Sequence, residues 1–282
     1  MTLHPAFVAG RVAVITGAAS GIGLATAERC AGLGMKICMV DINAKALADA
    51  AETVSSGATS PGDVIWSVTD VADRDAMVAL KAKVQAFGEI AVLMNNAGTE
   101  GGGSLFGDPD RWQRILSVNL QGMINGVQVF GADMLAQSFP SAIINTGSKQ
   151  GITCPPGDTA YNISKAGVKV LSEALAHEIR QHHGCQTSAF LLIPGFTFTG
   201  FTKVHTATKP AAAWTPEQVV DFMLARMSAG DFYILCPDND VTRALDNKRI
   251  RWAADDIIEN RPPLSRWHAD YKAAFAATLD DA

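Results

Sequence analysis

The sequence predicts an α/β fold built on one doubly wound parallel sheet of seven strands, with helices on both faces and a helical C-terminal extension. Three observations support this prediction. Short, uncharged apolar runs recur along the chain, segments with helical periodicity separate them, and a glycine-rich turn follows the first run. Nearly continuous apolar runs are typical of parallel strands that are covered on both faces. The alternation therefore indicates β-α-β units with right-handed crossovers.

Each expected strand is rich in branched or aromatic residues, which favour extended backbone. Helical segments, among them residues 22–31 and 74–87, lie between the runs and supply the crossovers. In chain order, we expect strands at residues 12–15, 37–40, 64–68, 90–94, 142–144, 189–193 and 232–235.

The chain divides into one large domain and an extension. No linker or low-complexity segment interrupts the alternating pattern, so residues 1–236 are predicted to form a single catalytic domain. Residues 237–282 carry aromatic side chains such as Trp252 and Trp267 among charges, on both sides of Pro262 and Pro263, which stop helices. We expect this extension to pack on the domain as helices. It could also reach the active site of its own or a neighbouring subunit.

Composition excludes several classes of partner. The 282 residues are 48% hydrophobic and 18% charged, with a net charge of -5, so a nucleic-acid footprint or an anionic membrane surface is not indicated. No apolar run has the length of a membrane span. The five cysteines are scattered without a Cys-x-x-Cys pair, and the six histidines form no metal-ligand cluster. We therefore expect a cytoplasmic protein that binds small molecules and no metal.

A glycine-rich segment at residues 16–23, Thr-Gly-Ala-Ala-Ser-Gly-Ile-Gly, directly follows the first strand and opens a helix. Glycine lets the backbone turn tightly and approach a pyrophosphate, and the helix start offers free N–H groups and a positive dipole end. A plain structural turn is the alternative, but the strand before and the helix after favour a Rossmann-like dinucleotide site.

The acidic residue at the end of the second strand indicates which dinucleotide is bound. Asp41 can accept hydrogen bonds from both adenosine ribose hydroxyls, and its charge would repel a 2'-phosphate. No Lys or Arg in residues 18–20 or directly after Asp41 could neutralise that phosphate. NAD is therefore predicted in preference to NADP. Asp41 could also cap the helix that begins near Asn43.

Tyr161 and Lys165 are four positions apart in a helical stretch, and Ser148 lies thirteen residues before Tyr161. Residues at i and i+4 share one helix face, so the ammonium of Lys165 can lie beside the phenol and lower its pKa from about 10 towards neutrality. Taken alone, this spacing is more often a solvated helix pair. Beside a dinucleotide site, it predicts a general acid/base that exchanges a proton with an alcohol or ketone.

These motifs, in this order, resemble the short-chain dehydrogenase/reductase family in its compact type. The resemblance covers residues 12 to about 235 and includes Asn95-Asn96-Ala97-Gly98 after the fourth strand, and Asp70-Val71 after the third. It implies a catalytic tetrad of Asn119, Ser148, Tyr161 and Lys165. It also implies that the dinucleotide is bound by Gly17, Ser20, Gly21, Ile22, Gly23, Asp41, Ile42, Asp70, Val71, Asn96, Ala97, Gly98, Tyr161, Lys165, Pro194, Gly195, Thr197 and Thr199.

The same resemblance assigns a role to each member of the tetrad. Tyr161 would exchange the proton as hydride moves between the carbinol carbon and the nicotinamide, and Ser148 would hydrogen-bond the substrate oxygen. Lys165 would lower the pKa of Tyr161 and bind the nicotinamide ribose, while Asn119 would hold a water that links Lys165 to solvent. The implied enzyme is an NAD-dependent oxidoreductase that acts on CH–OH groups.

Two segments should shape the substrate pocket, residues 150–158 and 196–214, and both offer apolar or aromatic side chains. We expect a hydrophobic or aromatic secondary alcohol and its ketone, although core packing explains the same aromatics equally well. The residues expected to contact the substrate are Ser148, Gln150, Cys154, Tyr161 and Phe196.

Two alternatives remain on the same scaffold: a non-redox lyase or dehalogenase, and a catalytically silent NAD-binding regulator. The complete tetrad argues against the second, and the glycine cradle with Asp41 argues against a dehalogenase. We expect a homodimer or homotetramer, with an apolar stripe on the Tyr161 helix as a possible dimer face. After the last strand, residues 236–240 depart from the family's usual Gly-Gly ending, which weakens the prediction of a tetramer.

Overall fold

The computed structural model describes residues 2–200 and 208–280. Its centre is a seven-stranded sheet in the order β3-β2-β1-β4-β5-β6-β7, and every neighbouring pair is parallel. The expected doubly wound α/β fold is confirmed, and each strand lies where the apolar runs predicted it. The strands are β1 (Val12–Thr16), β2 (Lys36–Asp41), β3 (Val64–Val68), β4 (Ile90–Asn95), β5 (Ser141–Thr146), β6 (Thr187–Ile193) and β7 (Tyr233–Leu235).

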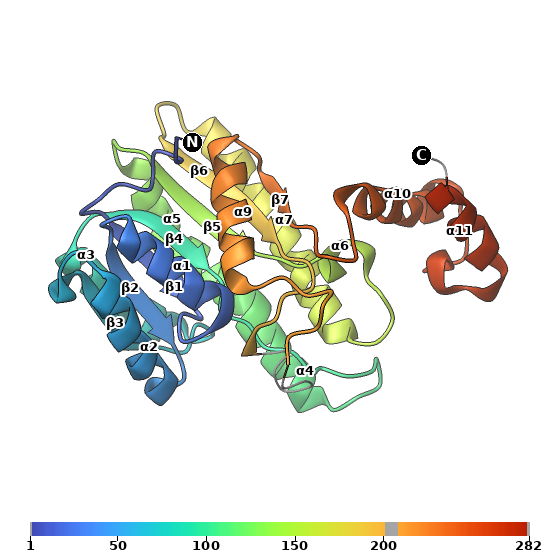
Figure 1. The fold of residues 1–282 in the computed structure, drawn as a ribbon, viewed down its shortest axis with the longest axis horizontal. Helices are drawn as coiled ribbons and strands as arrows, with labels where there is room; N and C mark the ends of the chain where they lie inside the picture. The colour runs from blue at the N-terminus through green and yellow to red at the C-terminus, as the bar shows by residue number, and fades with distance from the viewer. Residues whose placement is uncertain (1, 201–207, 281–282) are drawn as a thin grey trace.

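Helices cover both faces of the sheet (Figure 1). One face packs against α1 (Gly21–Gly32), α2 (Ala44–Gly57) and α9 (Pro216–Ser228). The opposite face packs against α3 (Arg74–Phe87), α5 (Gly122–Ala136) and α7 (Thr159–Gln181). Because both faces are covered, the central strands β1, β4 and β5 are buried along their whole length, which explains their continuous apolar sequences.

The strand order reverses direction between β1 and β4, which are neighbours although β2 and β3 lie between them in sequence. In open α/β sheets, ligands bind beyond the carboxyl ends of the strands at such a switch point. The glycine-rich turn after β1, the segment after β4 and the turn after β5 all leave the sheet at this edge. The topology therefore brings the predicted motifs together.

The C-terminal extension lies at one side of the domain (Figure 1). It consists of α10 (Arg243–Ile258), two short 3-10 turns and α11 (Lys272–Asp280), and α10 contacts the short helix α6 (Gln150–Thr153) of the domain. Trp252 is 7% exposed and forms the centre of the extension, where its ring meets Phe275 and its indole N–H donates to Ser265 at 2.7 Å. The extension is therefore helical, as expected.

The apolar stripe on α7 is divided between two environments. Leu175 is buried in the core against the sheet, and Leu171 and Ile179 pack against core clusters of their own chain. Val170, in contrast, is 62% exposed. Most of the stripe therefore stabilises the domain itself, and only part of it is available to a second subunit.

Two further observations concern the chain as a whole. All five cysteines are free thiols, in agreement with their scattered positions. Within residues 2–200 and 208–280, no helix combines the length and the apolar character that crossing a membrane requires.

Candidate active site

One cavity of about 460 Å³ opens at the carboxyl edge of the sheet and gathers residues from six separate segments. The glycine turn lines one end, and the residues after β5 and β6 line the other. The predicted site residues that line it are Gly17, Ser20, Gly21, Ile22, Asp41, Asn96, Gly98, Ser148, Gln150, Tyr161, Lys165, Pro194, Gly195, Phe196, Thr197 and Thr199.

The glycine turn has the geometry of a phosphate cradle. Gly17 and Gly21 have φ values of 66° and 57°, in the left-handed region that glycine adopts without strain. At Gly23, a Cβ would lie 2.2 Å from the carbonyl oxygen of Gly17, so only glycine allows α1 to start this close to the turn. Ser20 stands at the N-cap of α1, beside N–H groups that no helical carbonyl accepts. These features fit a dinucleotide pyrophosphate.

Thr16 and Asn96 hold the two sides of the switch point together. The hydroxyl of Thr16 accepts the backbone N–H groups of Asn96 at 2.8 Å and Ala97 at 3.0 Å, and the Asn96 side chain donates to the carbonyl of Thr16 at 3.1 Å. Thr146 at the end of β5 donates to the Asn96 side chain at 3.2 Å. The cavity floor is thus a hydrogen-bonded unit that spans β1, β4 and β5.

Asp41 lies at the end of β2 and faces the same cavity. One carboxylate oxygen accepts the N–H of Ala19 in the glycine turn at 3.1 Å, and the other accepts the N–H of Asn43 at 3.0 Å. Asn43 is the cap of α2, through its bond from Ala46, so Asp41 is not the cap. Each Asp41 oxygen keeps acceptor capacity that can receive a ribose hydroxyl.

Tyr161 and Ser148 form the reactive pair. Ser148 follows β5, Tyr161 lies in the first turn of α7, and their hydroxyl groups are hydrogen-bonded to each other. The backbone of Tyr161 donates at 3.3 Å to Asp158, the N-cap of α7, which fixes where the helix starts. Two hydroxyl groups therefore converge on one point of the cavity, where an alcohol or ketone oxygen could bind both.

Lys165 lies one helical turn after Tyr161 and is almost completely buried, with 4% of its surface exposed. Its ammonium group donates to the carbonyl of Thr146 at 2.8 Å and stands 5.6 Å from the centre of the Tyr161 ring. Burial lowers the pKa of Lys165 to about 8. The ammonium of Lys165 therefore lies near the ring of Tyr161, as predicted.

The pKa of Tyr161 differs from the sequence-based expectation. Burial raises it to about 12; the bond to Ser148 opposes this rise, and the carboxylates of Glu100 and Asp158 add to it. The expectation of a lowered pKa considered only the neighbouring lysine and omitted desolvation, which disfavours any charged form. The raised pKa favours the protonated phenol, which is the form that donates a proton to a ketone.

Asn119 lies inside a π-helical turn, residues 117–121, and is fully buried. Its amide donates to the carbonyl of Thr99 at 2.8 Å and accepts the N–H of Thr99 at 2.7 Å. A weaker bond at 3.4 Å reaches Ser164 in α7. Asn119 thus holds the segment after β4 against the helix that carries Tyr161. Its role in a water relay stays a prediction.

Some predicted residues do not line this cavity. Gly23 and Ala97 lie behind the cradle, where they allow close packing. Ile42 and Asp70 are exposed, and Val71 is buried in the core. Cys154 is partly buried at the end of α6, where burial raises the pKa of its thiol, so it is not an activated nucleophile.

Sequence reasoning missed several residues that line the cavity. Thr146 ends β5 and Gly147 follows it, Gly200 follows Thr199, and Glu100 and Lys149 bring opposite charges. Glu100 lies five residues beyond the β4 strand, and Lys149 follows Ser148, so proximity in sequence to the motifs was the available signal.

The expected substrate-pocket insert is only partly described. Residues 201–207 lie outside the described residues. Trp214 packs against Phe222 and the core cluster under α9, with ring centroids 5.7 Å apart. Its indole N–H donates to Asn239 at 3.1 Å. Of the insert's described aromatics, Phe196 lines the cavity, and core packing accounts for Trp214.

A dinucleotide cradle joined to a Ser-Tyr-Lys constellation at the edge of a parallel sheet defines a nicotinamide-dependent oxidoreductase. The family model for short chain dehydrogenases matches residues 11–210, which is more than half of the chain. The protein belongs to the short-chain dehydrogenase/reductase family, whose members act on CH–OH groups.

Several known proteins are similar to this chain. Galactitol 2-dehydrogenase (L-tagatose-forming) of Cereibacter sphaeroides is 33% identical over 68% of this chain and 74% of its own. A short-chain dehydrogenase/reductase of Burkholderia phymatum, solved in complex with NAD, is 33% identical with a TM-score of 0.80, covering 90% of this chain and 96% of its own. A metagenomic short-chain oxidoreductase, solved with NADP, is 27% identical with a TM-score of 0.67, covering 82% and 98%.

Proposed function

We propose that this protein is an NAD-dependent dehydrogenase/reductase that interconverts a hydrophobic or aromatic secondary alcohol and its ketone. One observation carries the proposal: the hydroxyl groups of Ser148 and Tyr161 and the ammonium of Lys165 share one cavity with the glycine cradle. A protein that only bound the dinucleotide would not require this pair of hydroxyl groups beside a buried lysine.

The side chains divide the work between proton transfer and positioning. Ser148 donates a hydrogen bond to the substrate oxygen and stabilises the charge that develops there. Tyr161 gives its proton to that oxygen during ketone reduction and takes it back during alcohol oxidation. Lys165, held by Thr146, places an ammonium next to the phenol, where it can also bind ribose hydroxyls. The dinucleotide supplies the hydride or accepts it.

The choice of NAD over NADP rests on Asp41. Its carboxylate faces the cavity and is held in place by the N–H groups of Ala19 and Asn43. A fixed negative charge at this position favours the two free hydroxyls of NAD and repels the 2'-phosphate of NADP. The Burkholderia relative was solved with NAD, and the metagenomic relative with NADP, so the family accommodates both.

The substrate class follows from the walls of the cavity near Ser148. Phe196 lines the cavity and is 41% exposed, so its ring is available for contact with an apolar substituent. Glu100 places a carboxylate close enough to raise the pKa of Tyr161, and such a charge disfavours anionic substrates. These features support a neutral carbinol with an apolar group.

A panel of secondary alcohols and ketones, with NAD and NADP supplied separately, tests this function through the absorbance of the reduced nicotinamide. We expect turnover of aryl or alkyl carbinols with NAD. Faster turnover of polyols would refute the substrate class, and product formation without an absorbance change would identify a non-redox enzyme. Dinucleotide binding without any turnover would identify a regulator.

We also infer a cytoplasmic location and a homodimer or homotetramer. The free thiols support a reducing compartment. The exposed Val170 and Ile163 on α7 support a helix-to-helix contact between subunits, because apolar side chains at i and i+7 share one face.

A further inference from the structure

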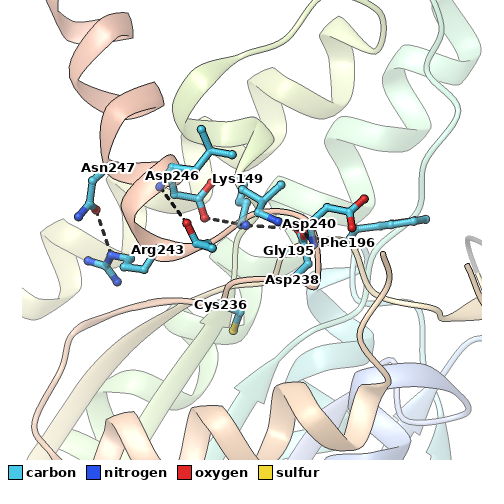
Figure 2. Close-up of polar contacts among 12 residues, drawn as sticks. Lys149, Gly195, Phe196, Cys236, Asp238, Asp240, Arg243, Asp246 and Asn247 are labelled. Carbon is cyan, nitrogen blue, oxygen red and sulfur yellow. Dashed lines mark hydrogen bonds and ion pairs between the residues drawn. The ribbon is translucent and has the colours of Figure 1, made fainter. Parts of the chain in front are cut away.

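A buried ion cluster joins the C-terminal extension to the active site (Figure 2). The ammonium of Lys149 stands 2.6 Å from Asp246 of α10 and 3.4 Å from Asp238, which lies in the turn after β7. The side chains are 18% exposed for Lys149, 5% for Asp238 and 6% for Asp246. Low exposure protects such pairs from screening by salt, so their geometry is held firmly.

Each member of this cluster, Lys149, Asp238 and Asp246, belongs to a different part of the molecule. Lys149 directly follows Ser148, so its position sets the turn that carries the reactive hydroxyl. Asp246 lies in the first turn of α10, which begins at the Thr242 cap. Asp238 belongs to the segment where the chain departs from the family's usual ending.

Asp238 holds the opposite wall of the cavity. The oxygen that faces Lys149 also accepts the backbone N–H of Phe196 at 3.2 Å. Its other oxygen accepts the N–H groups of Val241 at 2.8 Å and Asp240 at 3.2 Å, which closes the turn on itself. A Cβ at Gly195 would lie 2.8 Å from the Asp238 carboxylate and 3.1 Å from the Lys149 ammonium, so the chain after β6 packs directly on the cluster.

The turn that carries Lys149 is held just as closely against helix α7. A Cβ at Gly151 would lie 2.4 Å from the backbone carbon of Lys165, so α6 rests on the backbone of α7. Lys149 is the N-cap of α6. A displacement of Lys149 therefore changes the placement of Ser148 relative to Tyr161 and Lys165.

We propose that Lys149, Asp238 and Asp246 are positioning residues, through which the C-terminal extension sets the distance between the Ser148 turn and the Gly195–Phe196 turn. The two turns form opposite walls at the end of the cavity where the substrate oxygen binds, so the extension acts on orientation of the substrate. The loss of activity expected from this inference rests on the proposed function. The hydrogen bond from Phe196 to Asp238 gives a second expectation, on hydrogen exchange, that requires no turnover.

The test compares Asp246→Asn with Asp256→Asn. Asp256 lies on the same helix but binds Arg261 and Ser265 inside the extension, away from Lys149. Asp246→Asn should lower kcat/KM for the alcohol about 10- to 100-fold with little change in the Kd for the dinucleotide, because a small misplacement is costly to reaction geometry. Asp256→Asn should leave kcat/KM nearly unchanged at temperatures where both variants are folded.

The Lys149 variants separate charge geometry from simple packing. Lys149→Met should match Asp246→Asn, and Lys149→Arg should recover most of the activity, because a guanidinium can bridge two carboxylates. Equal losses in Asp246→Asn and Asp256→Asn would overturn the proposal, since the effect would then belong to folding of the extension. Equal losses in the methionine and arginine variants would also overturn it.

Hydrogen exchange of the dinucleotide-free protein gives the readout that does not depend on turnover. The amide of Phe196 donates to Asp238, so exchange in peptides that contain it should become faster in Asp246→Asn and stay the same in Asp256→Asn. Unchanged exchange in Asp246→Asn would refute the coupling. Faster exchange in an enzyme that turns over no alcohol would preserve the coupling and refute only the proposed function.

Discussion

The pKa values of Tyr161 and Lys165 move in the directions that burial imposes. The pKa of the phenol is raised to about 12, chiefly by burial, and the pKa of the ammonium is lowered to about 8, so both neutral forms are favoured. Ser148 is the neighbour that lowers the pKa of the phenol. The protein therefore keeps a protonated acid beside a lysine that titrates close to physiological pH.

Removing the hydroxyl of Tyr161 tests its role most directly. Tyr161→Phe keeps the ring and the helix but deletes the proton donor and the bond to Ser148. We expect kcat to fall by about 10²- to 10⁴-fold, the usual contribution of a general acid/base. Dinucleotide affinity, measured by fluorescence titration, should stay nearly unchanged. Substantial remaining turnover would contradict the assignment.

Asp41 is expected to control cofactor choice. Asp41→Arg should raise the ratio of kcat/KM with NADP to that with NAD by about 10- to 100-fold, because one charge-assisted hydrogen bond is lost and a phosphate partner is gained. Asp41→Asn keeps a side-chain acceptor for Ala19 and serves as the control, with an intermediate ratio. A strong preference for NAD in the arginine variant would show that other residues select the cofactor.

Lys165 should lower the stability of the fold at neutral pH. Its pKa falls from 10.5 to about 8 on folding, so the group stabilises the fold above pH 10.5 and this contribution is lost as pH falls through 8. Lys165→Met should therefore unfold at a higher denaturant concentration at pH 7. We expect its free energy of unfolding to be about 1–3 kcal/mol larger, once the loss of the bond to Thr146 is included. The difference between variant and parent should shrink when pH is raised to about 9.5. An equal difference at both pH values would contradict this account.

Two of the three glycines in helix α5, Gly126 and Gly131, lie in opposite environments. A Cβ at Gly126 would lie 2.0 Å from the side-chain oxygen of Asn95, which links β4 to Asn145 of β5 at 2.9 Å. At Gly131, a Cβ would meet nothing within 4 Å. The first glycine therefore permits close approach of helix and sheet, and the second has no packing role of this kind.

Alanine substitution at the two positions should change the stability of the protein in opposite directions. Gly126→Ala should destabilise the protein by about 1–3 kcal/mol, because the added methyl group overpacks the contact with the sheet. Gly131→Ala should stabilise it by about 0.5–1 kcal/mol, because alanine loses less backbone entropy in a helix. Chemical denaturation measures both, and losses of equal size would contradict the packing argument.

The elements themselves were the best predicted part of the structure. The run at residues 64–68 and the helix at residues 74–87 coincide with β3 and α3 as the structure has them. Most other strands extend one or two residues beyond the predicted run, because polar residues such as Thr16 and Asn95 still pair at the buried ends of strands. Hydrophobic patterns mark the core of a strand, whereas hydrogen bonding decides where it ends.

Across the whole molecule, the exposed part of α7 is the expected subunit contact. Val170 is 62% exposed, whereas Leu175 on the same helix is buried. We expect Val170→Asp to shift the protein towards monomer in sedimentation experiments, because a charge in an apolar contact between subunits is strongly unfavourable. Val78→Asp on α3, at a valine that is 50% exposed, is the matched control and should leave the assembly unchanged.

The amino-acid pattern was sufficient for the β-α-β order, the glycine cradle and the convergence of Asp41, Ser148 and Tyr161 on one edge. These features depend on local periodicity and on backbone conformations that glycine alone tolerates, and parallel strands then bring their carboxyl ends together. The ion cluster of Lys149 with Asp238 and Asp246 emerged from the folded chain alone. Lys149 and Asp238 are 89 residues apart, and no local pattern encodes such proximity. The direction of the Tyr161 pKa likewise required the folded chain, because desolvation depends on every segment that covers the side chain.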